Sequence, residues 1–203
     1  MTSINIKYHA IATSDIPEVL KFVEDAYYQG DVHFLDYDKE SVDNVINNKG
    51  PKKYTRTSEE DILQMIENKN GTLIGARIDN NDDKDGEIVA CAFVEKCDLK
   101  YAKLHNSQNP CKLGYICTHL NYQKLGLGEK IMNQVFNVVR EKGYDEVIIS
   151  VIDHKDWLKK WYSRKFGFQH YKNLMEEWPK PVSCFVREKY KESTKFALMR
   201  VKV

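Results

Sequence analysis

Two glycines, Gly126 and Gly128, lie in the segment NYQKLGLGEKIM, where a strand-like run gives way to a helical one. Glycine lets a backbone approach a bulky anion closely, and the first turn of a helix directs several N–H groups outward. This combination suits a pyrophosphate, and Lys124 and Lys130 would add positive charge. The same glycines could instead form only a tight turn between strand and helix, and by themselves they do not decide between these interpretations.

The residues on either side of the glycines predict the elements that position them. Residues 112–118 are β-rich, and six apolar residues after the turn lie on one helical face that Gly143 ends. These six are Ile131, Met132, Val135, Phe136, Val138 and Val139. A second β-branched strand is expected over 145–152, followed by a short helix that Asp156 caps and that carries Tyr162.

The two ends of the chain predict further strands and helices. Asp15 is expected to cap a first helix, and Thr57 and Glu60 have the spacing of a capping box for a second. The other predicted strands cover residues 4–13, 72–78, 87–95, 168–171 and 196–203. Hairpins at both ends and one βαβ unit in the middle favour a mixed sheet with helices on both faces.

Length and charge limit the classes of protein to consider. We expect a single domain over residues 1–203, with an irregular insertion at about 31–56. The net charge is only +1, because 31 Lys and Arg nearly balance 30 Asp and Glu, so nucleic acid is not an expected partner. The start of the chain lacks a signal-peptide pattern and no window resembles a membrane span, which favours a cytoplasmic protein without membrane contact.

Cysteine and histidine usage gives no indication of a metal or a disulfide. The five cysteines are an odd number without CxxC spacing, and the six histidines show no ligand spacing. The cysteines are Cys91, Cys97, Cys111, Cys117 and Cys184. We interpret them as reduced core thiols, and Cys117 as a core residue rather than a nucleophile, because no partner base is indicated near it.

Two segments, YICTHLNYQKLGLGEKIM and VIISVIDHKDWLKKWYSRKFGF, resemble the core of the GNAT superfamily of acetyl-CoA-dependent N-acetyltransferases. In that family, a Gln/Arg-x-x-Gly-x-Gly/Ala turn opens the helix that binds the coenzyme pyrophosphate. Here that turn runs from Gln123 to Gly128, and Tyr162 precedes a Phe-Gly-Phe end as a family tyrosine does. The resemblance implies an α/β fold with a central mixed, mostly antiparallel sheet of about seven strands and helices on both faces.

The resemblance also implies roles for individual residues. Acetyl-CoA would be the co-substrate, with backbone N–H groups near Ile116 and Thr118 on the acetyl carbonyl. Tyr162 would be the catalytic acid that protonates the leaving thiolate. The residues implied for coenzyme binding are Ile116, Thr118, Gln123, Lys124, Leu125, Gly126, Leu127, Gly128 and Glu129. No metal is implied.

Three positions depart from the family pattern. Leu120 stands where a Pro is usual, and Thr118 where a Val is usual. Lys155 stands where many members have an Asn that contacts the pantetheine arm, so that contact is not carried over. A general base must also deprotonate the acceptor amine, and the sequence offers Glu95, His119 and Glu177 without choosing among them.

We therefore predict an N-acetyltransferase that moves an acetyl group from acetyl-CoA to a primary amine of a small molecule. Transfer would be direct, in a ternary complex, with no covalent enzyme intermediate. Two alternatives stay open: a peptide or protein N-acetyltransferase, which would need an open groove, and a non-catalytic acyl-CoA-binding regulatory module. A homodimer is compatible with the sequence, which does not identify the acceptor.

Overall fold

The computed structural model describes residues 5–31, 56–79, 86–97, 107–122, 124–174, 186–191 and 195–203. Gln123 and nearly all of the insertion expected at about 31–56 lie outside these ranges. The strands are β1 Ile6–Ala10, β2 Gly71–Ile78, β3 Ile88–Lys96, β4 Pro110–Thr118, β5 Glu146–Ile152, β6 Gln169–Leu174 and β7 Phe196–Lys202. The helices are α1 Ile16–Asp31, α3 Glu59–Glu67, α5 Leu127–Glu141, α6 Asp156–Phe166 and the short α8 Glu188–Lys191.

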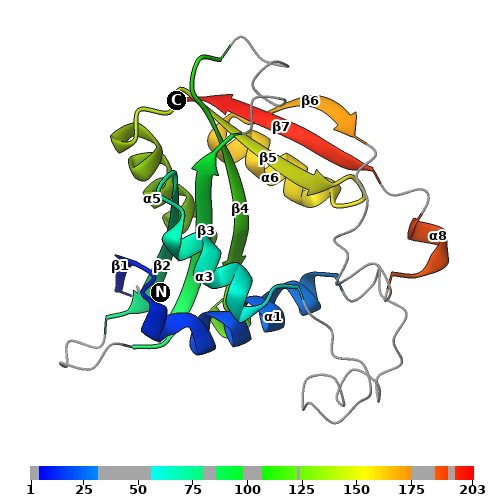
Figure 1. Ribbon diagram of the computed structural model, residues 1–203. Helices are drawn as coiled ribbons and strands as arrows, with labels where there is room; N and C mark the ends of the chain where they lie inside the picture. The colour runs from blue at the N-terminus through cyan, green and yellow to red at the C-terminus, as the bar shows by residue number, and fades with distance from the viewer. Residues whose placement is uncertain are drawn as a thin grey trace.

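The strands form one seven-stranded sheet in the order β1-β2-β3-β4-β5-β7-β6 (Figure 1). Every neighbouring pair is antiparallel except β4 and β5, which are parallel and are connected through α5. Parallel neighbours require such a crossover, because a tight turn can only reverse the chain. The predicted mixed, mostly antiparallel sheet is confirmed.

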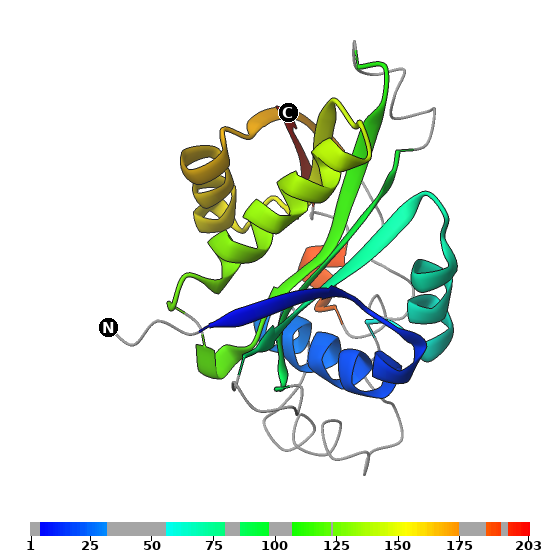
Figure 2. The same cartoon turned by 90° about the vertical axis from the view of Figure 1, so that its left-hand side faces the viewer.

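Helices cover both faces of the sheet, as predicted (Figure 2). On one face, α1 and α3 pack against β2, β3 and β4 around a buried cluster that includes Phe22, Ile62 and Phe93. On the other face, the apolar stripe of α5 lies against β2 to β5, and α6 contributes Tyr162 to the same cluster. No helix of the described ranges is long and apolar enough to cross a membrane.

The start of α3 corrects one prediction from the sequence. The capping box is formed by Ser58 and Asp61, whereas the sequence pattern predicted Thr57 and Glu60, one residue earlier. Ser58 Oγ accepts the Asp61 N–H at 3.1 Å, and Asp61 Oδ2 accepts the Ser58 N–H at 2.9 Å. Thr57 is buried instead, and its N–H donates to Glu24 Oε1 of α1 at 2.8 Å.

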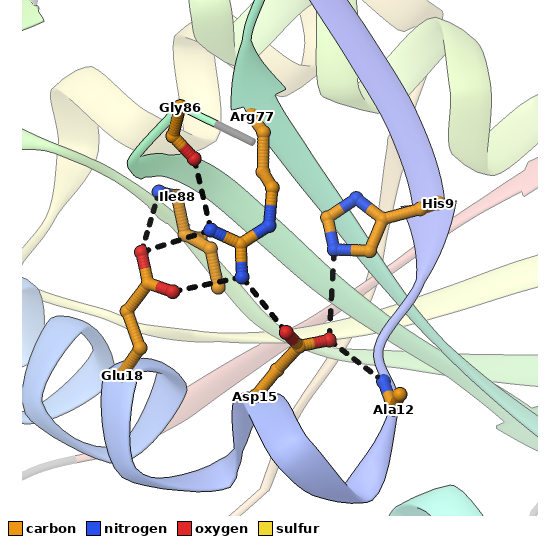
Figure 3. A network of polar contacts seen from close by, with 7 residues as sticks. All are labelled: His9, Ala12, Asp15, Glu18, Arg77, Gly86 and Ile88. Carbon is orange, nitrogen blue, oxygen red and sulfur yellow. Dashed lines mark hydrogen bonds and ion pairs between the residues drawn. The ribbon is translucent and has the colours of Figure 1, made fainter. Parts of the chain in front are cut away.

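A buried arginine fixes the start of α1 to the sheet (Figure 3). Arg77 of β2 is 9% exposed and lies 2.8 Å from Asp15 Oδ1 and 2.7 Å from Glu18 Oε2. Its Nη1 also donates to the carbonyl of Gly86 at 2.9 Å, while Glu18 Oε1 accepts the Ile88 N–H. One guanidinium therefore joins α1, β2 and the beginning of β3, as a planar fork of donors can.

We predict that Arg77→Met lowers the free energy of unfolding by about 1–3 kcal/mol, because it leaves two partly buried carboxylates without their cation. The matched control is Lys21→Met, which removes an exposed ion pair with Asp25 within α1 and should cost less than about 0.5 kcal/mol. Equilibrium unfolding in urea measures both variants. Equal losses would show that the Arg77 network contributes no more than a surface pair.

Candidate active site

A cavity of about 580 Å³ opens where β4 and β5 separate. Their parallel pairing begins at Pro110 and Glu146 and ends at Leu113 and Ile149. Both strands continue beyond that point, and their remaining residues line the cavity instead of pairing with each other. The sheet thus provides two facing strand edges between which an extended ligand can lie.

A β-bulge in β4 produces this separation. Cys91 of β3 pairs with Cys117, but Phe93, two residues on, pairs with Gly114, three residues back, so β4 holds one extra residue. Tyr115, within the bulge, has a φ of 51°, which is rare for a residue with a side chain. Because a bulge increases the local twist, it turns the end of β4 away from β5.

Contacts on the α1 face hold the bulge in this conformation. The Tyr115 hydroxyl lies 3.4 Å from Thr57 Oγ1, and its ring meets that of Tyr27 edge-on at 6.3 Å. The Cys91 thiol donates to the Tyr115 carbonyl at 3.3 Å. The strained residue is therefore fixed through its ring, its hydroxyl and its carbonyl.

The glycine turn forms one end of the cavity. Lys124 and Gly126 have φ values of 63° and 78°, and Gly126 is the N-cap of α5. The first hydrogen bond of the helix runs from the Lys130 N–H to the Gly126 carbonyl at 3.0 Å. The N–H groups of residues 127–129 precede that bond, and Gly126 supplies no side chain to cap them. They form a helix N-terminus suited to an anion.

The two glycines meet different constraints. A Cβ at Gly126 would touch nothing within 4 Å, so glycine is needed there for its positive φ rather than for space. A Cβ at Gly128 would lie 3.4 Å from the ring of Trp161 in α6. The space between the first turn of α5 and the Trp161 ring of α6 is thus narrow.

Most of the residues predicted for coenzyme binding line this cavity. They are Ile116, Thr118, Lys124, Gly126, Leu127, Gly128 and Glu129. Leu125 belongs to the same turn, but its side chain is 46% exposed and it is not part of the lining. Gln123 lies outside the described residues, so its place in the site stays a prediction.

Tyr162, on α6, lines the same cavity as these residues. Its side chain is 4% exposed, lines the cavity, and packs edge-on against Trp161 and Phe168 with ring centroids 5.0 Å and 5.5 Å away. Burial raises the pKa of Tyr162 well above its ordinary value, because a phenolate would lose its hydration there. The side chain is therefore a neutral phenol at physiological pH and can donate a hydrogen bond or a proton.

The other end of the cavity contains residues that the sequence analysis missed. Tyr27 and Asp31 of α1 line this end. Arg56, which precedes α3, also lines it, and its guanidinium lies 4.5 Å from the centre of the Tyr27 ring. Asp31 is 1% exposed and accepts a bond from Lys155 Nζ at 2.6 Å. These two residues are 124 positions apart, and no local pattern relates them.

Of the three suggested bases, the two that the structure describes lie outside the cavity. Glu95 lies near the end of β3, 3.4 Å from the side-chain amide of Asn68, and His119 stacks on Phe22 at 6.2 Å. Neither lines the cavity, and Glu177 lies outside the described residues. The carboxylates that do line its described walls are those of Asp31 and Glu129, and Glu129 is paired with Lys165 at 2.9 Å.

The described cysteines are buried free thiols, as predicted. They are Cys91, Cys97, Cys111 and Cys117, whereas Cys184 lies outside the described residues. Cys117 lines the cavity with its sulfur 3.3 Å from that of Cys91. Burial, and then the hydrogen bond with Cys91, raise the pKa of Cys117 well above its ordinary value, which opposes formation of a nucleophilic thiolate.

The model of the acetyltransferase (GNAT) family matches residues 39–168, which is more than half of the chain. The chain therefore belongs to this family, and it is an acetyl-CoA-dependent acyltransferase. A search of curated protein sequences finds no match.

Solved structures of acetyltransferases have the same fold. PaiA N-acetyltransferase from Thermoplasma acidophilum, in complex with coenzyme A, is 14% identical with a TM-score of 0.64, covering 98% of this chain and 100% of that one. A putative acetyltransferase from Acinetobacter baylyi is also 14% identical, with a TM-score of 0.65 and coverage of 100% and 94%. The ribosomal-protein-S18-alanine N-acetyltransferase from Escherichia coli is 13% identical, with a TM-score of 0.58 and coverage of 98% and 94%. At these identities, the likeness shows the fold alone.

We predict that Gly128→Val abolishes the thermal stabilisation of the protein by coenzyme A. The γ-methyl groups would fill the narrow space between the first turn of α5 and Trp161. For the wild type, ligand at 100 times its Kd adds about 2.7 kcal/mol, or roughly 5–10 °C in Tm for a chain of this size. Differential scanning fluorimetry with millimolar coenzyme A measures the shift.

Asn133→Val is the matched control, since it adds the same side chain to the exposed face of the same helix. This variant should keep the full shift. A Gly128→Val protein that is still stabilised like the wild type would contradict the assignment of the turn.

Proposed function

We propose that the protein acetylates a primary amine of a small molecule by direct transfer from acetyl-CoA within a ternary complex. One observation carries the proposal: a single cavity runs from the N-terminus of α5, past Tyr162, to the side chains of α1. A donor held at the first end would present its thioester beside Tyr162. An acceptor that enters from the α1 end would then meet it there.

The donor end fits the pyrophosphate of the coenzyme. Three N–H groups at the start of α5 precede the first helical bond, and the positive end of the helix dipole favours an anion at that point. Lys124 adds a positive charge in the same turn. We assign the pyrophosphate to Gly126, Leu127, Gly128 and Glu129 through their backbone, with Gln123 extending the turn as the family motif implies.

The separated edge of β4 fits the acetyl carbonyl. The N–H of His119 donates to the carbonyl of Val89 in β3 at 2.8 Å. Because N–H groups alternate between the two edges of a strand, those of Thr118 and Ile116 are directed toward the gap that faces β5. Donors fixed there in advance would polarise the carbonyl and stabilise negative charge that develops on its oxygen.

Acetyl-CoA supplies the acetyl group as an activated thioester. The acceptor nitrogen forms a bond to the carbonyl carbon, the carbon–sulfur bond breaks, and Tyr162 gives its phenolic proton to the sulfur that leaves. A thiol has a pKa of about 8.5, below that of the buried phenol, so this transfer requires that the phenolate be neutralised at once. The proton released by the acceptor nitrogen can serve that purpose within the ternary complex.

The state of Cys117 supports direct transfer rather than an acetylated enzyme. It is the cysteine among the described residues that lines the cavity, and its raised pKa disfavours the thiolate. An intermediate acetylated on cysteine would need that thiolate as its nucleophile. The free state of the described cysteines also supports a reducing compartment such as the cytoplasm.

The α1 end of the cavity favours a small acceptor over a peptide. The ion pair of Asp31 with Lys155 joins the end of α1 to the start of α6, so the two walls are connected there. Tyr27 and Tyr115 provide aromatic surface beside it. An end that an ion pair bridges and that aromatic side chains line suits a compact amine, whereas a peptide needs a groove that stays open along its length.

An assay with paired acceptors tests the proposed substrate class. Lysine amide and a nine-residue peptide with one lysine and an acetylated N-terminus offer the same ε-amine at different sizes, and free coenzyme A thiol reports turnover. We expect a wider panel of small amines to contain the best acceptor, and kcat/KM for lysine amide to exceed that for the peptide. A clear preference for the peptide would favour a peptide or protein acetyltransferase, and no turnover of any amine would favour a binding module.

We predict that Tyr162→Phe lowers kcat by about 100- to 10,000-fold, the range of general acid catalysis, while the Kd for acetyl-CoA and the Tm stay nearly unchanged. The phenyl ring keeps the packing against Trp161 and Phe168. Tyr144→Phe is the control, since Tyr144 is also buried but donates to the Asn70 carbonyl away from the cavity. Full turnover by Tyr162→Phe, with chemistry rate-limiting, would exclude Tyr162 as the acid.

A further inference from the structure

An exposed indole lies at the rim of the donor cavity. Trp157 is 68% exposed and lines the cavity from the first turn of α6. The other described aromatic residues of the lining are buried or partly buried. Trp157 therefore presents an unusually large apolar surface to solvent at the entrance of the site.

The position of Trp157 follows from its spacing to Trp161. Residues four apart lie on the same side of a helix, slightly more than one turn or about 6 Å apart along its axis. Trp161 is the ring that a Cβ at Gly128 would approach to 3.4 Å, so this side of α6 faces the start of α5. The ion pair between Lys165 and Glu129 shows the same two helix surfaces in contact one turn further along. Trp157 thus extends the wall that begins beside the glycine turn.

The chemistry of the coenzyme determines what can lie against that surface. With the pyrophosphate at the start of α5 and the thioester inside the cavity, the adenosine is joined to the outer side of the pyrophosphate and must lie at the rim. Adenine is a flat aromatic base, and stacking on an indole is favourable for any such base. An exposed tryptophan at the rim offers that platform at little cost in side-chain entropy, because its side chain has only two rotatable bonds.

We propose that Trp157 is the stacking platform for the adenine ring of the coenzyme. This inference rests on the donor placement given above and adds an adenine subsite to it. Trp157 acts in binding and takes no part in the transfer itself. Its contribution should therefore appear in the affinity for the donor, and only for donors that carry the base.

Isothermal titration calorimetry with two ligands tests the proposal. Coenzyme A carries the adenosine, whereas 4′-phosphopantetheine has the same arm and one phosphate without it. Trp157→Ala should weaken coenzyme A binding about five- to 100-fold and leave 4′-phosphopantetheine unchanged. Trp157→Phe should stay within a few-fold of the wild type for both. Ser163→Ala, an exposed change on the same helix, is the control and should alter neither.

The outcomes separate this inference from the proposed function. Equal coenzyme A affinity in Trp157→Ala and the wild type would overturn the adenine subsite, as would an equal loss for both ligands. A variant with unchanged coenzyme A affinity but a raised KM for the acceptor amine would place the indole at the acceptor instead. A wild-type protein that binds no coenzyme A would refute the donor site itself. Because Trp157 is exposed, its variants should keep the wild-type Tm, which confirms that they fold.

Discussion

The site depends on the loss of pairing between β4 and β5. A backbone N–H or carbonyl that is taken from a sheet and left without a partner costs about 1–3 kcal/mol, so strands do not separate without compensation. Here the bulge at Tyr115 redirects β4 after Leu113, and the freed edges face a cavity rather than solid core. A ligand with its own carbonyl and amide groups can restore those hydrogen bonds. A ligand bound between the two strands would therefore gain affinity and a fixed orientation from the groups that the separation leaves unpaired.

The bulge is itself strained, and its neighbours explain why it persists. A non-glycine residue at a φ of 51° costs on the order of 1–3 kcal/mol, and it persists only where the surrounding contacts hold it. Tyr115 is held by Thr57 through its hydroxyl, by Cys91 through its carbonyl and by Tyr27 through its ring. All three lie on the α1 face of the sheet or in the elements that cover it. The separation of β4 from β5 is therefore maintained by packing on the face of the sheet that α1 covers.

The features that could be predicted from the sequence are those determined by interactions between residues close together in the chain. The α5 stripe repeats every three to four residues, and the turn with Gly126 needs a positive φ, so both were predictable. The start of α3 shows the limit of such reasoning. Thr57 with Glu60 and Ser58 with Asp61 have the same spacing, and long-range contacts of Thr57, such as the bond of its N–H to Glu24, 33 residues away, favour the second pair.

The α1 end of the cavity could not be predicted, because it is assembled from distant residues. Asp31 and Lys155 can pair only because the fold brings the end of α1 next to the start of α6. The separation of β4 from β5 depends on a register shift between β3 and β4 at Tyr115. A glycine inside a strand, as at Gly114, is one signal of a bulge that a sequence can carry.

The placement of α1 connects these points. Its first turn is fixed to β2 and β3 through Arg77, and its last residue is fixed to α6 through Lys155. Residues in the range 26–31 of α1 line the cavity, so their position depends on ion pairs at both ends of one helix. Ion pairs are directional and a packed apolar face is not, which makes them suited to fixing how far a helix slides along a sheet. The hydrophobic face of α1 thus packs the helix against the sheet, while the ion pairs at its two ends fix where Tyr27 and Asp31 lie in the cavity relative to Tyr162.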